Sequence, residues 1–153
     1  MLALLGWIVL TAIAAALGAI ASTGAPGFYA RLVRPSWAPA AAVFGPVWTV
    51  LYVMMAIAAW RVSRVRGGWL PLTLFVVQLG VNALWSWLFF AWHNGALALA
   101  DIVLLWLLVV ATIVAFWRVS RVSAILLLPY LAWITFAGLL CYRIWRANPQ
   151  ALG

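Results

Sequence analysis

The stretch GGWLPLTLFVVQLGVNALWSWLFFAWHNGALALA, residues 67–100, contains no charged side chain. One membrane-spanning helix needs about 20 apolar residues, so this stretch is too long to be a single crossing. The segment AWHNGA, residues 91–96, supplies a break, because Asn-Gly is a strong turn signal. The sequence therefore predicts two membrane-spanning helices here, at about 70–92 and 96–117, joined by a tight turn.

The rest of the chain repeats this pattern of long apolar runs that end in arginine or in turn residues. Of its 153 residues, 70% are hydrophobic and 7% are charged, whereas soluble domains are about 45–50% apolar and about 25% charged. The apolar runs predict three more helices, at about 2–23, 43–62 and 123–146. We therefore expect one domain, residues 1–153, with an all-α fold: a five-helix transmembrane bundle with a structured, proline-containing loop between its first two helices.

The excess of positive charge is explained by the membrane. The chain has nine basic residues, all arginine, against one acidic residue, which gives a formal net charge of +8. The arginines fall at the ends of the apolar runs, where their side chains reach lipid headgroups. The motif WRVSRV occurs at 60–65 and again at 117–122, which places those two helix ends at the same membrane face. We therefore expect membrane lipid, and no nucleic acid, as a partner.

Titratable side chains are too few for conventional catalysis. Cys141 and His93 are each alone of their kind, and Asp101 is the single acid. Metal sites and hydrolytic triads need clusters of such groups, so we expect no metal site and no required cofactor. Two interpretations of Asp101 remain open. It is either a functional group, because a charge inside a membrane is costly, or a favourable partner of a helix N-terminus.

Amide and aromatic side chains form a stripe on the third predicted helix. Gln78, Asn82 and Trp85 lie three or four residues apart, as do Trp48 and Tyr52 on the second helix. Amides are costly in lipid, so this stripe should face the interior of the bundle. One interpretation is an aromatic cavity with a few polar groups, which is typical of a small-molecule site. The alternative, equally compatible with the spacing, is a close-packed bundle in which the amides hydrogen-bond between helices.

Four segments carry a resemblance to a known family. The stretch RPSWAPAAAVFGPVWTVLY, residues 34–52, resembles the signature of the TspO/MBR family, the translocator proteins, also called tryptophan-rich sensory proteins or peripheral benzodiazepine receptors. The family's third, fourth and fifth helices are similar to QLGVNALWSWLFF (78–90), LADIVLL (99–105) and LPYLAWITFAGLLCYRIWRAN (128–148). The resemblance thus covers helices two to five in order, and only the first helix is generic.

The resemblance implies a homodimer that binds porphyrins such as protoporphyrin IX and haem, sterols such as cholesterol, and isoquinoline or benzodiazepine drugs. It also implies that the proline-rich loop covers a pocket inside the bundle. Trp48 and Trp133 match two tryptophans linked in the family to light-dependent porphyrin degradation, and would be catalytic if that reaction occurs. The ligand-binding candidates, from the resemblance and the interior stripe together, are Tyr29, Trp37, Trp48, Tyr52, Gln78, Asn82, Trp85, Asp101, Trp133 and Ala137.

Two further groups of residues are candidate contacts for ligand. Arg31 and Arg34 on the first loop could bind porphyrin propionates through paired hydrogen bonds, or could contact lipid headgroups instead. Leu140, Tyr142 and Arg146 fit the loose cholesterol-recognition pattern, although a Tyr-Arg helix end at a membrane interface explains them equally well.

The chain departs from the family pattern at three places. Pro39 stands alone where many members have paired prolines, so the covering loop should be looser. Ser86 and Trp87 replace one or two prolines after Trp85, which puts a kink in the third helix in doubt. Cys141 replaces the usual asparagine, which weakens the sterol pattern.

Small residues at helical spacing allow close helix approach, either within the chain or between subunits. On the first helix these are Ala14, Gly18 and Ser22, and on the third they are Gly80 and Ala83.

Three functions follow from these observations. The leading hypothesis is a membrane binding protein for tetrapyrroles and other lipophiles, acting as a sensor, carrier or transporter. The second is an enzyme-like, light-dependent oxidative degradation of porphyrin. The third is a non-catalytic, packed bundle that organises other membrane proteins, which predicts no cavity. In every case we expect a multi-pass integral membrane protein, in a bacterial cell membrane.

Overall fold

The computed structural model describes residues 2–153, so that residue 1 of the expected domain lies outside the described residues. The described chain is helical and contains no strand. Its elements are α1 (Leu2–Ala21), α2 (Ala25–Arg31), the 3-10 turn η1 (Ala41–Val43), α3 (Phe44–Ser63), α4 (Trp69–Ser86), the π-helical turn η2 (Trp87–Ala91), α5 (Gly95–Val119), α6 (Arg121–Leu126), α7 (Leu128–Ala147) and α8 (Pro149–Leu152).

Five helical segments of the described chain are long and apolar enough to cross a membrane. They are Leu2–Ala21, Ala41–Ser63, Trp69–Ala91, Gly95–Val119 and Arg121–Ala147. The expected five-helix bundle is therefore confirmed, and the predicted boundaries differ from the observed ones by at most two residues. These differences are as large as helix ends usually vary, because terminal turns fray.

The first loop contains a helix that the sequence pattern did not predict. After α1 the chain turns through residues 22–24 and forms α2, with a proline in its first turn. Proline is compatible with this position, since the missing N–H would have no partner there. Phe28, Tyr29 and Leu32 from this segment are buried. The covering loop is therefore part of the folded bundle.

A π-helical turn ends the third crossing. The N–H of Trp92 donates to the carbonyl of Trp87 at 2.8 Å, and that of Asn94 donates to Leu88 at 2.8 Å. This wider turn follows directly after Ser86, at the position where many family members have proline. The helix therefore changes its geometry here without proline, which shifts Phe89 and Phe90 relative to the preceding stripe.

The fifth crossing was expected to be one helix but is divided into α6 and α7 at Leu127. Pro129 lies in the first turn of α7 and has no N–H, so an uninterrupted helix would lack a hydrogen bond there. The side chain of Ser120 caps the start of α6 by accepting from the N–H of Ser123.

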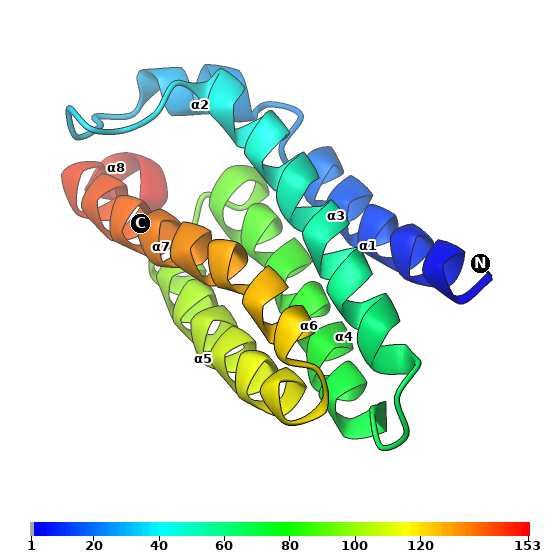
Figure 1. Cartoon of the computed structure of the whole chain (residues 1–153). Helices are drawn as coiled ribbons and strands as arrows, with labels where there is room; N and C mark the ends of the chain where they lie inside the picture. The colour runs from blue at the N-terminus through cyan, green and yellow to red at the C-terminus, as the bar shows by residue number, and fades with distance from the viewer. Residues whose placement is uncertain (1) are drawn as a thin grey trace.

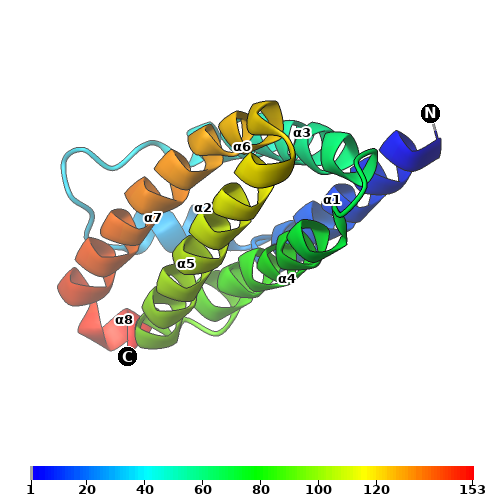
Figure 2. The same cartoon turned by 60° about the horizontal axis from the view of Figure 1, so that its bottom comes forward.

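The helices form an elongated bundle whose termini lie at opposite ends (Figure 1, Figure 2). The helix α4 packs against α5 and α1, and α5 packs against α7. The helix α3 packs against α1 and α6. The helix α2 crosses the end of the bundle at which α1 ends and α3 begins, as Figure 1 shows.

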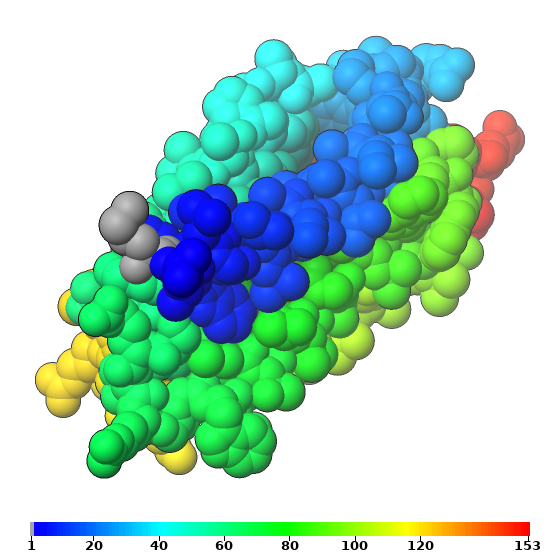
Figure 3. All heavy atoms as spheres, turned by 90° about the vertical axis from the view of Figure 1, so that its right-hand side faces the viewer, coloured from blue at the N-terminus to red at the C-terminus, as the bar shows by residue number. Residues whose placement is uncertain are grey.

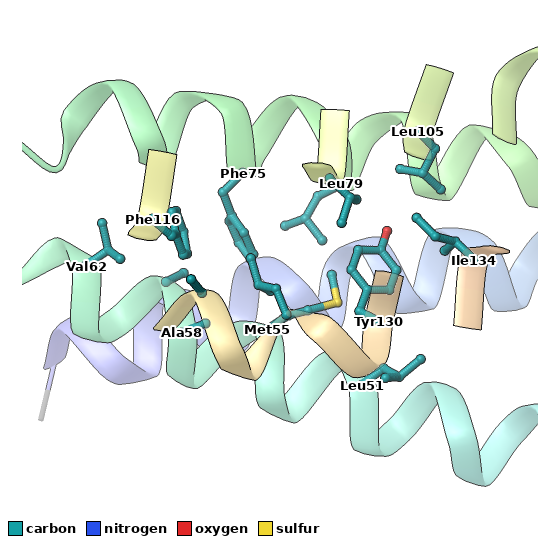
Figure 4. Packing of buried hydrophobic residues seen from close by; sticks show 14 of the residues in the cluster. Leu51, Met55, Ala58, Val62, Phe75, Leu79, Leu105, Phe116, Tyr130 and Ile134 are labelled. Carbon is teal, nitrogen blue, oxygen red and sulfur yellow. The ribbon is translucent and has the colours of Figure 1, made fainter. Parts of the chain in front are cut away.

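Two apolar clusters fill the interior at different levels. The first contains Met55, Phe75, Phe116 and Tyr130, from α3, α4, α5 and α7, and Figure 4 shows these side chains pointing into the space between the helices. The second lies at the α2 end and includes buried residues of α2, η2, α5 and α7. Close packing at both levels holds the membrane-spanning helices in place. The region between α1, α3 and α7 is not filled in this way and forms a cavity.

The repeated WRVSRV motif forms the same contact twice. The Arg64 guanidinium lies 5.5 Å from the centre of the Trp60 ring, and Arg121 lies 5.8 Å from that of Trp117. These distances are typical of cation–π pairs. Both pairs lie at helix ends, where tryptophan and arginine anchor a helix at the membrane interface.

Candidate binding cavity

A cavity of about 820 Å³ lies between α1, α3, α4 and α7 and is closed at one end by α2. Its lining is mainly apolar and aromatic. Two of its tryptophans face it from different helices, Trp48 from α3 and Trp133 from α7. Trp48 packs beside Tyr52 at 5.5 Å between ring centres, and Trp133 packs edge-on to Phe44 at 5.8 Å. The cavity therefore offers aromatic faces to anything that it holds.

Residues from the sequence-predicted set line this cavity together. Five are aromatic: Tyr29, Trp48, Tyr52, Trp85 and Trp133. The other two are Asn82 and Ala137. They come from four elements, α2, α3, α4 and α7, so that only the packing of the bundle brings them to one space. Their assignment as ligand contacts stays a prediction.

A chain of hydrogen bonds runs from the cavity wall into the core. The Tyr52 hydroxyl donates to Asn82 Oδ1 at 2.6 Å, and Asn82 Nδ2 donates to the Tyr130 hydroxyl at 3.0 Å. Tyr130 then donates to Gln78 Oε1 at 2.9 Å. This relay joins α3, α4 and α7. Asn82 and Gln78 therefore hydrogen-bond between helices, and Asn82 also lines the cavity.

Most hydroxyl groups around the cavity are engaged with the protein, with Ser86 as the exception. Thr11, Ser22 and Thr49 donate to carbonyls of their own helices, and Tyr29 donates to Pro39 O at 3.0 Å. None of the nine arginines lines the cavity, and neither does Asp101. The interior surface is consequently uncharged and of low polarity.

Two indole N–H groups of cavity-lining residues have no acceptor in the described chain. These are Nε1 of Trp85 and Nε1 of Trp133, both buried. Buried donors are almost always paired, so an unpaired one marks either stored strain or a partner from outside the chain.

The loop over the cavity is held by tyrosine and arginine. The Arg34 guanidinium lies 4.7 Å from the centre of the Tyr29 ring, which is itself buried against Phe44. Burial raises the pKa of the Tyr29 phenol above its ordinary value, and the nearby Arg34 partly offsets this. Tyr29 is therefore neutral at physiological pH and keeps the proton that it donates to Pro39.

Asn148 fastens the same loop to the far end of the chain. Its Oδ1 accepts from the Val33 N–H at 2.8 Å, and its Nδ2 donates to the Val33 carbonyl at 2.9 Å. The same Nδ2 also donates to Ile144 O at 2.8 Å. One side chain therefore pairs with both polar groups of a loop residue, as a neighbouring strand would.

Replacing Asn148 with alanine should release the loop without unfolding the bundle. The two bonds to Val33 are lost, whereas the burial of Phe28 and Tyr29 remains. We expect the amide of Val33 to exchange with deuterium much faster, and the amides of α4 to keep their protection. Hydrogen exchange with mass spectrometry in detergent measures both. Unchanged exchange at residues 32–36 would show that Asn148 does not hold the loop.

The remaining predicted contacts lie outside the cavity lining. Trp37 is exposed on the loop and packs edge-on to Phe136 at 5.7 Å. Gln78 is buried behind the wall, at the inner end of the relay. Asp101 is buried in α5 and its Oδ2 has no hydrogen-bond partner in the described chain.

The arginines and the sterol pattern also lie away from the lining. Arg31 is exposed at the end of α2, and Arg34 is exposed beside Tyr29. Leu140 is buried in the second apolar cluster, whereas Tyr142 and Arg146 are exposed. The three members of the sterol pattern therefore do not share one surface.

The wall contributed by α1 was not predicted from the sequence. Thr11, Ala15 and Gly18 line the cavity from this helix. A Cβ placed on Gly18 would lie 3.2 Å from Ser86 Oγ of α4, so the small residues of α1 permit close approach within the chain. The small residues Ala14, Gly18 and Ser22 did indicate that another helix can approach α1 closely. Their spacing does not say which helix this is.

Comparisons with known proteins agree with this architecture. The family model for the TspO/MBR family matches residues 7–146. The chain belongs to the TspO/MBR family. The match extends over every crossing, including most of α1, which on its sequence alone was generic.

Relatives in this family come from different kinds of organism. Protein CrtK of Rhodobacter capsulatus is 42% identical over 147 residues, which cover 94% of this chain and 91% of the relative. The tryptophan-rich sensory protein of Cereibacter sphaeroides is 38% identical and covers 93% of this chain and 92% of its own length. The translocator protein of Bos taurus is 37% identical over 94% of this chain and 88% of its own. These relatives support a membrane sensor or translocator role.

Proposed function

We propose that this chain binds tetrapyrroles such as protoporphyrin IX and haem, and other lipophiles such as sterols and isoquinoline or benzodiazepine drugs, as a membrane sensor or carrier. The observation that supports this is the uncharged, aromatic cavity of about 820 Å³. Small-molecule sites have about 300–1,000 Å³ and mostly apolar walls. Each aromatic contact with a flat ligand contributes about 0.5–1.5 kcal/mol beyond area burial.

The polar edge of such a ligand should point toward α2. Arg31 and Arg34 lie on this side, and Arg34 contacts Tyr29 of the cavity wall. A carboxylate placed in the interior would meet no cation, whereas at this end it would reach a guanidinium. The unpaired indole N–H groups of Trp85 and Trp133 favour a ligand that also carries an acceptor oxygen.

Haem should bind in this cavity as an apolar disc. Among the described residues, no histidine, cysteine or methionine lines the cavity, and the hydroxyls of Tyr29 and Tyr52 are engaged in hydrogen bonds. These are the side-chain types that ligate haem iron in proteins. We therefore expect haem and metal-free protoporphyrin IX to bind with similar affinity, which competition between the two in one titration would measure. A preference of more than tenfold for haem would point to an iron ligand and contradict this.

The test of the proposal is a tryptophan-fluorescence titration with protoporphyrin IX, in detergent and in the dark. We expect saturable quenching, weakened by up to about tenfold in Trp48→Phe and in Trp133→Phe, because each loses one large stacking surface. Trp69→Phe is the matched control, since Trp69 is 74% exposed and does not line the cavity. Linear quenching that never saturates would overturn the binding function.

A second candidate function is light-dependent oxidative degradation of the bound porphyrin. It is favoured by one observation, that Trp48 and Trp133 line the same cavity. A porphyrin excited beside an indole can exchange one electron with it, and no acid or base is needed. Illumination of the same samples separates the two functions: a carrier returns its ligand unchanged, whereas degradation removes porphyrin absorbance in wild type and less in the two variants.

The packed-bundle alternative predicts no cavity, and it does not explain the space between α1, α3 and α7. We also propose that the chain forms a homodimer and that it resides in a bacterial cell membrane. The bacterial relatives support the choice of membrane.

A further inference from the structure

The cavity extends to the outer surface of the bundle between α1 and α3. On α3, Thr49, Val53 and Ile57 line the cavity and are also exposed. On α1, Ile8 and Ala12 do the same. Residues that line an interior space and are exposed on the outside mark an opening between the two. In a transmembrane bundle this opening faces lipid.

Both helices carry small residues along part of this opening. Ala15 and Ala19 of α1 face it from one side, and Gly45 and Thr49 of α3 from the other. Nothing lies within 4 Å of the position that a Cβ would take on Gly45. Figure 3 shows the surface hollowed between α1, in blue, and α3, in cyan, close to α2. We call this hollow, bounded by Ala15, Ala19, Gly45 and Thr49, the lateral opening.

The lateral opening extends to hydrocarbon depth at Ala15. Ala15 is six residues before the end of α1, which corresponds to about 9 Å along the helix. At this depth there is no bulk water to fill an apolar space, and the surrounding medium consists of acyl chains. The hydroxyl of Thr49 donates to Gly45 O at 2.9 Å, so it presents no unpaired donor to the hydrocarbon.

At the α2 end the loop is held against the bundle, although Pro26 of α2 lines the cavity and is exposed. The loop is fastened by the two bonds between Asn148 and Val33 and by the burial of Phe28 and Tyr29. An apolar molecule that moves along the bilayer therefore meets the opening between α1 and α3, whereas the loop at the α2 end is held in place.

We propose that an acyl chain of a bilayer lipid enters the cavity through the lateral opening and occupies part of it. The chain fits because the walls are apolar and carry no charge, and because the opening adjoins the hydrocarbon in which the chain already lies. Burial from lipid into the cavity gains little hydrophobic free energy, so packing against Trp48 and Trp133 is the main attraction. This occupancy depends on the cavity alone and does not require that tetrapyrroles bind.

The experiment uses the full chain in nanodiscs of phosphatidylcholine that carries a diazirine near the end of one acyl chain. After illumination, mass spectrometry of peptides locates the labelled residues. We expect label on the cavity side of α3, at Trp48 or Tyr52, as well as on bilayer-facing Val103 and Leu107, which are exposed on α5. Label on the bilayer-facing positions without label in the cavity would overturn the proposal.

Two variants of neighbouring residues test the route. Ala15→Trp fills the lateral opening, whereas Ala16→Trp adds the same side chain at an exposed position of α1 that does not line the cavity. We expect cavity labelling to fall several-fold in Ala15→Trp and to be unchanged in Ala16→Trp. If Ala15→Trp does not fold, Ala19→Phe is the second variant at the opening. Cavity labelling that is the same in a folded opening variant and in Ala16→Trp would rule out this route.

Discussion

Asn82→Leu is expected to destabilise the bundle and to weaken ligand binding at the same time. Asn82 accepts from Tyr52 and donates to Tyr130, so it joins the cavity wall to the core. Leucine has a similar volume but can form neither bond. The Tyr52 hydroxyl then has no acceptor, at about 1–3 kcal/mol for a buried group left unpaired, whereas Tyr130 loses one donor but keeps its bond to Gln78. The Tyr52 ring, no longer fixed, also stacks less well with Trp48.

Thermal unfolding in detergent and the protoporphyrin titration measure the two effects on the same preparation. Val77→Ala is the control, because Val77 lies on the same helix and is exposed. We expect a lower midpoint and weaker binding in Asn82→Leu, and neither change in the control. If Asn82→Leu unfolds at the wild-type temperature and binds equally well, the relay contributes nothing to the site.

Gly95→Ala should destabilise the protein through a collision at the start of α5. A Cβ on Gly95 would lie 2.9 Å from the Cβ of Trp145 and closer still to atoms of its ring. Two effects of opposite sign compete. Alanine favours a helix over glycine by about 1 kcal/mol, whereas overpacking typically costs about 1–3 kcal/mol. We expect the collision to prevail, because it involves the base of the indole side chain rather than its free end, and because the indole N–H is bonded to Gly153 O.

A double-mutant cycle with Trp145→Ala measures this collision. Removing the indole makes room for the new methyl group, so that Gly95→Ala should be neutral or stabilising in the Trp145→Ala background. Gly6→Ala is the matched control, since no atom of the described residues lies within 4 Å of its Cβ position and alanine should only improve α1. A lower unfolding midpoint for Gly95→Ala in both backgrounds would assign the effect to another cause.

The crossings could be predicted because each is a property of a continuous segment. The uncharged run of residues 67–100, the arginines at helix ends and the turn at Asn94 and Gly95 all act locally, and a bilayer demands about 20 apolar residues per crossing wherever they occur. The division at Leu127 and the π-turn at Trp87–Ala91 were not predicted. Both depend on how the backbone departs from regular α-helical hydrogen bonding and on how neighbouring helices accommodate it.

The candidate site was predictable in part, from helical spacing and from the family resemblance. The helical spacing of Asn82 and Trp85 places them on one face, and the cost of an amide in lipid turns that face inward. The resemblance supplied Trp48, Tyr52 and Trp133. Spacing could not tell that Gln78 lies behind the wall, because a residue one turn away on the same stripe is covered by whatever helix packs there.

By itself, the sequence determined that this chain crosses a membrane five times, where its helix ends lie and which family it resembles, because hydropathy and turn chemistry are local. Only the tertiary structure decided which side chains share the cavity, that its lining is uncharged, that Asn148 holds the loop and that α1 and α3 leave a lateral opening. These features arise between segments that are distant in sequence. Their positions depend on helix packing, which the pattern of any single helix does not contain.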